Sequence, residues 1–299
     1  MGYPVINYLL HITIIGEITI PFAMGLQLEI GDTGLYNFGH VAFFGLGAYT
    51  SALLTIHGVP FMLSLFLSLA MAGGIAWFAG LPILRLRGDY FGLAMLGFAE
   101  ITRKVFLNES WLTRGPMGIP GIPQPSFFGF SIHTLPQFAT FYGLFVLVAT
   151  LTTRHVVRSP LGRVLHAIRD DEYSATALGK DTFRFRRVSL LMGTLLAALG
   201  GIFWAHYITF ISPSDFTLNE TILVLLIVVL GGPWGISGTI WATFLVIGFQ
   251  EGLRFLPLPE TFGRVIAPIQ QMFFGLILVL IVLKREKKWF SKGSRFAQD

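Results

Sequence analysis

Apolar stretches of about 20 residues, rich in Leu, Ile, Val and Phe, recur along this chain and limit the folds open to it. A helix of that length crosses about 30 Å of hydrocarbon, the core thickness of a bilayer. Only 12% of the 299 residues are charged, about half the share that is usual in a soluble domain. The sequence therefore predicts an all-α polytopic membrane protein rather than a soluble helical protein with buried core helices.

Basic residues are concentrated in two segments, residues 154–187 and the tail 284–299. Cytoplasmic loops of membrane proteins retain Lys and Arg, so we predict that both segments face the cytoplasm. No Lys or Arg occurs from Met1 to Leu84, and a cleavable signal peptide needs a basic start, so none is predicted. A basic tail beside a membrane contacts lipid and sets orientation. The net charge of +5 therefore implies membrane lipid as a partner and no nucleic acid.

Counting crossings outward from these basic segments predicts about eight to ten transmembrane or re-entrant helices in a single domain, residues 1–299. The carboxyl terminus then lies in the cytoplasm and the amino terminus outside. Residues 27–38 fall near the inner face with two acids and no base, so we expect a re-entrant segment there. The predicted spans are 5–26, 39–56, 61–84, 90–107, 138–153, 188–208, 220–231, 236–253 and 265–283.

Two Gly-rich interruptions lie inside apolar sequence, at Asn37–Tyr49 and at Leu230–Thr239. Irregular backbone within a membrane must be buried in protein or line a cavity, because lipid satisfies no N–H or C=O group. Broken helices in corresponding places of two halves are typical of a transporter's central pathway. Close helix packing is the alternative, and it remains open for Gly45 and Gly47. Gly231-Gly232-Pro233 favours a pathway, since Pro also removes a backbone hydrogen bond.

Ionisable side chains within spans are costly and are therefore functional candidates; Glu17, His40, Glu100 and Glu251 are of this kind. Glu100 precedes Arg103 on one helical face, so an internal ion pair is the alternative to a pathway role. For His40, which borders the first break, ordinary hydrogen bonding is the alternative. The predicted pathway residues are Asn37, Phe38, Gly39, His40, Gly45, Glu100, Gly231 and Gly232.

Residues 159–179 are the most informative part of the large basic loop. Apolar residues recur there at helical spacing with charges between them, and Asp170-Asp171-Glu172 lead into a small-residue helix that ends at Gly179. We predict a helix, a kink and a short helix at the cytoplasmic surface, an element that a motor subunit can hold in a groove. On the outer side, residues 108–137 are rich in Gly and Pro and predict a shaped, irregular cap.

The order Gly-Arg-x-x-x-Ala-Ile-Arg-x-x-Glu-x-x-Ala-x-x-x-Gly in this loop resembles the EAA coupling loop of bacterial ABC importer permeases, most closely the LivM-type branched-chain amino acid permeases. Asn37–Thr50, Leu84–Phe91, Phe98–Ile101, Thr113–Pro123, Val229–Gly232 and Glu251–Arg254 resemble further blocks of that family. The resemblance assigns ATPase coupling to Gly162, Arg163, Ala167, Arg169, Asp170, Glu172, Ala175 and Gly179, and the outer loop to Thr113, Arg114, Gly115 and Gly118.

The resemblance implies a permease subunit that translocates Leu, Ile and Val across the bacterial inner membrane. It implies a homologous second permease, two cytoplasmic ATPase subunits and an extracytoplasmic substrate-binding protein as partners, and membrane subunits built as inverted repeats. The chain departs from the family pattern at Arg114, where Gly is usual, and in Gly179-Lys180-Asp181. Because relatives carry urea or short amides, these substrates stay open. An ion-gradient-driven secondary transporter is the less favoured alternative.

Enzyme signatures are missing from the sequence. No Gly-x-x-x-x-Gly-Lys-Ser/Thr stretch occurs, and Gly179-Lys180 is followed by Asp181, so no P-loop ATPase site is predicted. His-Glu-x-x-His and nucleophile-elbow spacings do not occur either. The chain has no cysteine, which excludes disulfides and thiolate metal sites. We therefore predict a transport subunit without cofactor or metal, and keep an intramembrane hydrolase or acyltransferase as a minor alternative.

Overall fold

The computed structural model describes residues 2–86, 88–127, 130–232 and 235–253, and the isolated helical positions 272, 275, 276 and 279. Its helices are α1 (Gly2–Leu26), α2 (His40–Ile56), α3 (Phe61–Ile83), α4 (Asp89–Asn108), α5 (Ser110–Thr113), α6 (Leu135–Arg158), α7 (Pro160–Asp170), α8 (Glu172–Ala177), α9 (Thr182–Ile208), α10 (Leu218–Gly231) and α11 (Gly235–Leu253). Shorter elements are the π-helix η1 (Gln27–Asp32), the 3-10 turns η2 (Gly115–Met117) and η3 (Pro213–Asp215), and the strands β1 (Ile119–Pro120), β2 (Ser126–Phe127), β3 (Phe130–Ser131) and β4 (Phe210–Ile211).

Most predicted spans are helices close to their expected bounds. Five helical segments of the described chain are long and apolar enough to cross a membrane: Val5–Asp32, Phe61–Ile83, Leu135–Arg158, Thr182–Ile208 and Pro213–Gly231. Helix α2 is apolar but shorter, because it begins only after a buried break. These helices confirm a helical polytopic membrane protein. Apart from its isolated helical positions, the predicted span 265–283 lies outside the described residues, and so does the tail 284–299.

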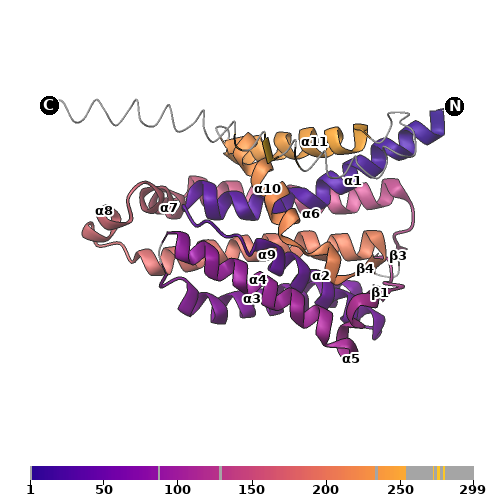
Figure 1. Ribbon diagram of the computed structural model, residues 1–299. Coiled ribbons are helices and arrows are strands. Elements are labelled where there is room, and N and C mark those ends of the chain that lie inside the picture. The colour runs from indigo at the N-terminus through magenta and orange to yellow at the C-terminus, as the bar shows by residue number, and fades with distance from the viewer. Residues whose placement is uncertain are drawn as a thin grey trace.

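The long helices run side by side along one axis. Figure 1 shows α7 and α8 at one end of the bundle and α5, β1 and β4 at the other. Helices α1 and α9 are the most buried of the long apolar helices and α6 is the least, so α1 and α9 form the centre. The amino end of α1 lies opposite α8 (Figure 1), which is the relative placement that the charge pattern predicts.

Glycines bring α2 and α9 close together at the centre of the bundle. A side chain at Gly47 would collide with the backbone of Ala198, and one at Gly201 would collide with the carbonyl group of Phe44. Close backbone approach of this kind is a main source of helix association in membranes, where burial from water contributes little. Gly47 therefore has the packing role that was one of its two interpretations.

The segment predicted as re-entrant takes a different form. Residues 27–32 continue α1 as a π-helix, and residues 33–39 then return into the protein, where α2 begins at His40. Gln27, Glu29 and Asp32 are buried in this turn. The chain reverses inside the protein because hydrogen-bond partners for these polar groups are available there and not in lipid.

Candidate functional site

The basic loop between α6 and α9 folds into the predicted helix, kink and short helix. Ser159 caps α7, because its Oγ accepts a hydrogen bond from the Leu161 N–H at 3.2 Å. Asp171 caps α8 by accepting from the N–H groups of Tyr173 and Ser174 at 2.9 and 3.1 Å. Gly179 follows α8 with φ of +77°, a conformation that glycine adopts without strain.

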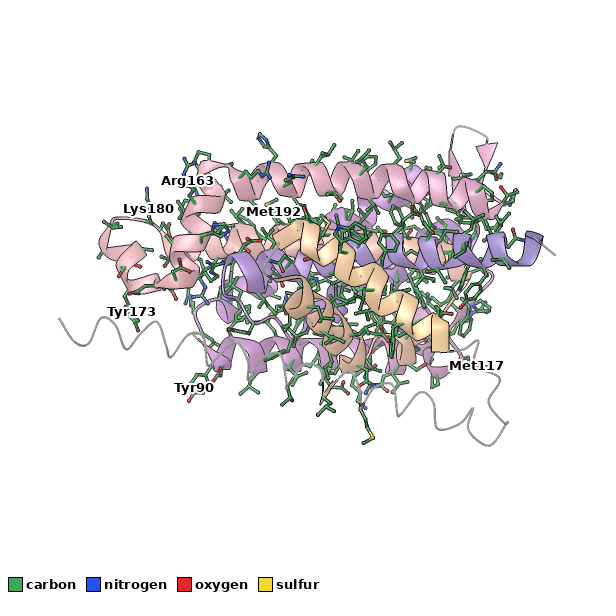
Figure 2. The ribbon with its side chains drawn as sticks, turned by 90° about the horizontal axis from the view of Figure 1, so that it is seen from above. Tyr90, Met117, Arg163, Tyr173, Lys180 and Met192 are labelled. Atoms are coloured by element: carbon green, nitrogen blue, oxygen red, sulfur yellow. The ribbon has the colours of Figure 1, made fainter. Side chains whose placement is uncertain are left out.

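Helices α7 and α8 have one buried face and one exposed face. Leu165 and Ile168 lie on the buried face, and Figure 2 shows Arg163, Tyr173 and Lys180 at the end of the molecule far from Met117. Among the predicted coupling residues, Gly162 and Ala175 are buried, Glu172 is half-buried, and Arg163, Ala167, Arg169, Asp170 and Gly179 are exposed. This arrangement leaves a polar surface free at the tip of the loop.

Glu172 ties α8 to α9 and to the turn between α3 and α4. Its Oε1 accepts hydrogen bonds from Arg186 Nη1 at 3.1 Å and from Thr182 Oγ1 at 3.3 Å. Arg186 is buried, and its Nη2 also donates to the Leu86 carbonyl oxygen at 3.3 Å. A buried guanidinium needs a nearby acid, so Glu172 fixes the position of α8 on the bundle.

A buried polar cluster lies where α2 begins. Asn37 Nδ2 donates to Glu29 Oε2 at 2.8 Å, and the same oxygen is 3.2 Å from His40 Nδ1. His40 Nε2 donates to the Phe22 carbonyl oxygen at 3.0 Å, and Asn37 Oδ1 accepts from the Gly39 N–H at 3.0 Å. The side chains of Glu29, Asn37 and His40 are all 0% exposed. The structure thus brings Asn37, Gly39 and His40 together around a carboxylate.

That carboxylate, Glu29, was not among the candidates chosen from the sequence. It lies in the apolar first part of the chain, where no Lys or Arg occurs from Met1 to Leu84. An acid in such a segment has no basic side chain nearby, so its partners must be neutral or imidazole groups. Asn37 and His40 are two such groups, and they border the first break. This reasoning would have selected Glu29 together with the first break.

Other predicted pathway residues lie elsewhere. Phe38 is placed against Gly92 of α4, and Gly45 faces aromatic rings of α4 and of the segment before α10. The Glu100 side chain is 53% exposed on α4, apart from the buried cluster, and accepts a hydrogen bond from Arg103 Nε at 3.0 Å. Glu100 therefore forms the internal ion pair that was the alternative to a pathway role.

The second predicted break lies between α10 and α11. Gly231 ends α10, and a side chain there would collide with the backbone of α11. Gly232 follows it, while residues 233–234 lie outside the described part of the chain. Thr239 Oγ1 of α11 donates to Gln27 Oε1 of η1 at 3.4 Å. The second break thus contacts the segment that leads into the first.

The outer loop is shaped by left-handed backbone. Thr113 is buried, and its Oγ1 donates to carbonyl groups of Phe106 and Glu109 at 2.7 and 2.9 Å. The φ angles of Arg114, Gly115 and Gly118 are +59°, +57° and +69°. Since glycine adopts positive φ most easily, the backbone at residue 114 accounts for the glycine expected there.

Contacts with α9 and with the strand that follows it hold the outer loop to the bundle, and these contacts were not predicted from the sequence. Strand β1 pairs with β4 after α9, with Ile119 opposite Ile211. The buried His206 of α9 places Nδ1 2.7 Å from the Pro123 carbonyl oxygen and Nε2 2.8 Å from Ser51 Oγ. The outer loop is thereby fixed over the ends of α2 and α9.

These features together define a class: a helical polytopic membrane protein that carries a capped, amphipathic helix pair at one end and broken helices in its interior. Comparison with known proteins narrows the class. The chain belongs to the family described as branched-chain amino acid transport system / permease component, whose model matches residues 8–282.

Curated relatives share this description. The high-affinity branched-chain amino acid transport system permease protein LivM of Escherichia coli (strain K12) is 33% identical over 261 residues, covering 79% of this chain and 61% of that protein. The protein of the same name from Salmonella typhimurium is equally similar. The probable branched-chain amino acid transport permease protein LivM of Methanocaldococcus jannaschii is 22% identical over 299 residues, covering 87% of this chain and 86% of that protein. This chain spans 61% of the length of the two enterobacterial relatives. No solved structure matches it.

Proposed function

We propose that this chain is the membrane-spanning permease subunit of an ABC importer that moves Leu, Ile and Val across the bacterial inner membrane. The observation that carries the proposal is the α7–α8 pair, which stands at one end of the bundle in a chain of this permease family (Figure 1). Such a pair suits docking to a cytoplasmic motor, because its helices are capped and its exposed surface combines polar residues with the apolar side chains of Tyr173 and Leu178.

In the proposed complex, ATP is hydrolysed by two cytoplasmic ATPase subunits and not by this chain. Tyr173 and Leu178 are 73% and 79% exposed at the tip of the loop, and large exposed apolar side chains are typical of contact surfaces. A homologous second permease and membrane lipid flank the bundle. An extracytoplasmic binding protein delivers substrate at the opposite end, over α5, η2 and β1. The proposal includes about eight to ten membrane helices, inverted repeats and a cytoplasmic tail.

The proposed transport step begins at α8. Closure of the ATPase subunits moves the α7–α8 pair, and this movement passes to the adjoining spans. The contacts of Glu172 with Arg186 and Thr182 position α8 for this step. The pathway between Gly39 and Gly232 then switches from outward-facing to inward-facing. Changing Glu172 to Lys should keep the protein in the membrane and let ATP hydrolysis continue, while uptake is lost.

Substrate competition in proteoliposomes tests the proposed substrate. The complex of both permeases, the ATPases and the binding protein is reconstituted, and uptake of labelled leucine is measured with excess unlabelled isoleucine, valine, alanine or urea. We expect isoleucine and valine to suppress uptake and urea to leave it unchanged. Transport of urea or a short amide in place of leucine would contradict the branched-chain assignment and support the alternative substrate class.

The buried Glu29–His40 contact favours a second candidate function. A carboxylate and an imidazole that are both 0% exposed and 3.2 Å apart are groups of the kind that carry protons in ion-gradient-driven transporters. Such a transporter does not need α7 and α8 as a docking element. The energy source of uptake separates the two functions.

A further inference from the structure

Helix α7 contacts the α1–α2 connection, which we define as residues 27–39. His166 Nε2 hydrogen-bonds to Asp32 Oδ1 at 2.8 Å, and Arg169 Nη1 donates to the Gly31 carbonyl oxygen at 2.8 Å. The backbone of Gly34, with φ of +76°, lies against the backbone of Arg169. The coupling loop therefore holds this connection through side chains and backbone together.

The other side of the connection leads directly to the buried start of α2. Thr33 Oγ1 is 2.6 Å from Ser189 Oγ of α9, which in turn donates to the Leu28 carbonyl oxygen at 3.3 Å. Glu29 then binds Asn37, as described above. Gly31 and Asp32 are thus only a few residues from the Glu29–Asn37–His40 cluster at the first break, so a displacement of either residue can reach the cluster.

The contact at Asp32 is costly to maintain. Asp32 is 6% exposed, and its second oxygen, Oδ2, has no hydrogen-bond partner within the described part of the chain. A buried carboxylate with an unsatisfied oxygen destabilises a folded protein. A half-satisfied buried acid between the coupling loop and the connection is more easily explained by a role in movement than by stability.

The connection is a shorter and more local segment than α9, the other helix that the coupling loop contacts. Its first half, η1, is a π-helix, a rare form that occurs mostly at functional sites. Helix α9, which Glu172 contacts through Arg186, is instead the most buried of the long apolar helices, packed against α1, α2 and α3. Moving α9 disturbs its packing against α1, α2 and α3 together, whereas a local movement of the connection disturbs only the contacts of residues 27–39 with their neighbours.

We propose that His166 and Arg169 drive the α1–α2 connection, so that movement of the coupling loop reaches the start of α2 through Asp32 and Gly31. This inference rests on the proposed function and deepens it. His166 and Asp32 are positioning residues: they contact no substrate and act through the Glu29–Asn37–His40 cluster. The contact of Glu172 with Arg186 positions α8 for docking.

The first test compares two substitutions at His166 in the complete reconstituted importer. His166→Gln keeps an N–H donor for Asp32, whereas His166→Phe keeps a ring and removes the donor. We expect the amount of leucine moved per ATP hydrolysed to stay near its original value in His166→Gln. In His166→Phe it should fall about 5-fold or more, a typical coupling effect, while ATP hydrolysis persists. Arg103→Gln, which breaks an exposed ion pair on α4, is the matched control and should leave the ratio unchanged.

The second test follows the movement itself and uses the absence of cysteine from the chain. Tyr36, which is 52% exposed on the connection, is replaced by Cys, and Thr176 on α8 is replaced by Cys in a separate variant. Alkylation of Tyr36→Cys should change between nucleotide-free and ATP-bound complexes. It should become independent of nucleotide when His166→Phe is added.

The Thr176→Cys variant distinguishes failure of the route through Asp32 from failure of the proposed docking of the coupling loop. Suppose that the ATPase subunits protect Thr176→Cys from alkylation. If alkylation of Tyr36→Cys is then independent of nucleotide, or changes with nucleotide to the same extent when His166→Phe is added, the route through Asp32 is wrong and the docking proposal stands. If Thr176→Cys is not protected, the coupling loop does not dock, and both proposals fail.

Discussion

Arg114 and Thr209 have left-handed backbone, with φ angles of +59° and +60°, although neither is glycine. Such a conformation costs an L-residue about 1–2 kcal/mol, and a β-branched residue such as Thr is a marked outlier there. Both lie at the end of the bundle that carries α5, β1 and β4 (Figure 1), where the Thr209 carbonyl oxygen accepts from the Ile122 N–H at 3.2 Å. Strained residues thus hold the outer loop in its shape.

Replacing Arg114 by Gly should stabilise the protein. The substitution relieves the strain at residue 114, and we expect the free energy of unfolding in detergent to rise by about 1 kcal/mol. Lys104→Gly is the matched control, since it places glycine at an exposed right-handed position inside α4 and should lower the stability by about 1 kcal/mol. Equal losses in both variants would show that residue 114 is not strained.

Replacing Glu29 by Leu should destabilise the protein, although Leu suits an apolar interior. Asn37 Nδ2 would lose its acceptor inside the protein, and an unsatisfied buried donor costs about 1–3 kcal/mol. Thermal unfolding in detergent measures the loss. Glu100→Gln, which removes an exposed partner, should change stability by less than about 1 kcal/mol. A Glu29→Leu protein as stable as the original would contradict the buried cluster.

At the scale of elements, local features were predictable and distant partnerships were not. Asp171 and Gly179 mark the ends of α8 by themselves, because capping depends on neighbours in sequence. The π-helix η1 depends on contacts such as that between Asp32 and His166, which no local pattern shows. Glu29 differs from η1 in this respect, because its partners Asn37 and His40 follow it closely in the sequence.

Removing the cap of α8 should loosen this short helix. Hydrogen bonds from the Ser174 side chain and backbone lower the pKa of Asp171. A pKa lowered by folding contributes stability that is present above the unfolded value of about 4 and is lost as pH falls. Asp171→Ala should therefore lower the amide-exchange protection factors of Glu172–Ala177 at neutral pH and abolish the further loss of protection that acidification causes in the original protein. Asp170→Ala, which removes only a partner of Arg169, is the control; equal exchange in both variants would exclude the cap.

Substitutions at two glycines test how tightly the turn between α10 and α11 is packed. A Cβ at Gly231 would lie 2.5 Å from backbone atoms of Gly238 and Thr239, whereas no described atom lies within 4 Å of one at Gly248. Gly231→Ala should lower the stability by about 1–3 kcal/mol, and Gly248→Ala should raise it by up to about 1 kcal/mol. A neutral Gly231→Ala would mean that the turn has free space, as a pathway requires.

At the scale of the whole molecule, charge predicted which segments share an end of the bundle. Counting the predicted spans 61–84 and 90–107 puts the turn between α3 and α4 on the same side as the large basic loop, and Arg186 donates to the Leu86 carbonyl oxygen of that turn. The contact between η1 and α11 was not predictable, because it depends on how two breaks far apart in sequence pack together. In the proposed mechanism, the coupling loop receives the force and the buried Glu29–Asn37–His40 cluster responds to it.

The energy source of uptake tests the central claim most directly. The complete complex is reconstituted in vesicles, and leucine uptake is measured with ATP inside while ionophores collapse the proton and sodium gradients. Because this chain is proposed to conduct while partner subunits hydrolyse ATP, we predict uptake that requires internal ATP and continues without the gradients. Uptake that proceeds without ATP and stops when the gradients collapse would contradict the account and identify an ion-driven transporter.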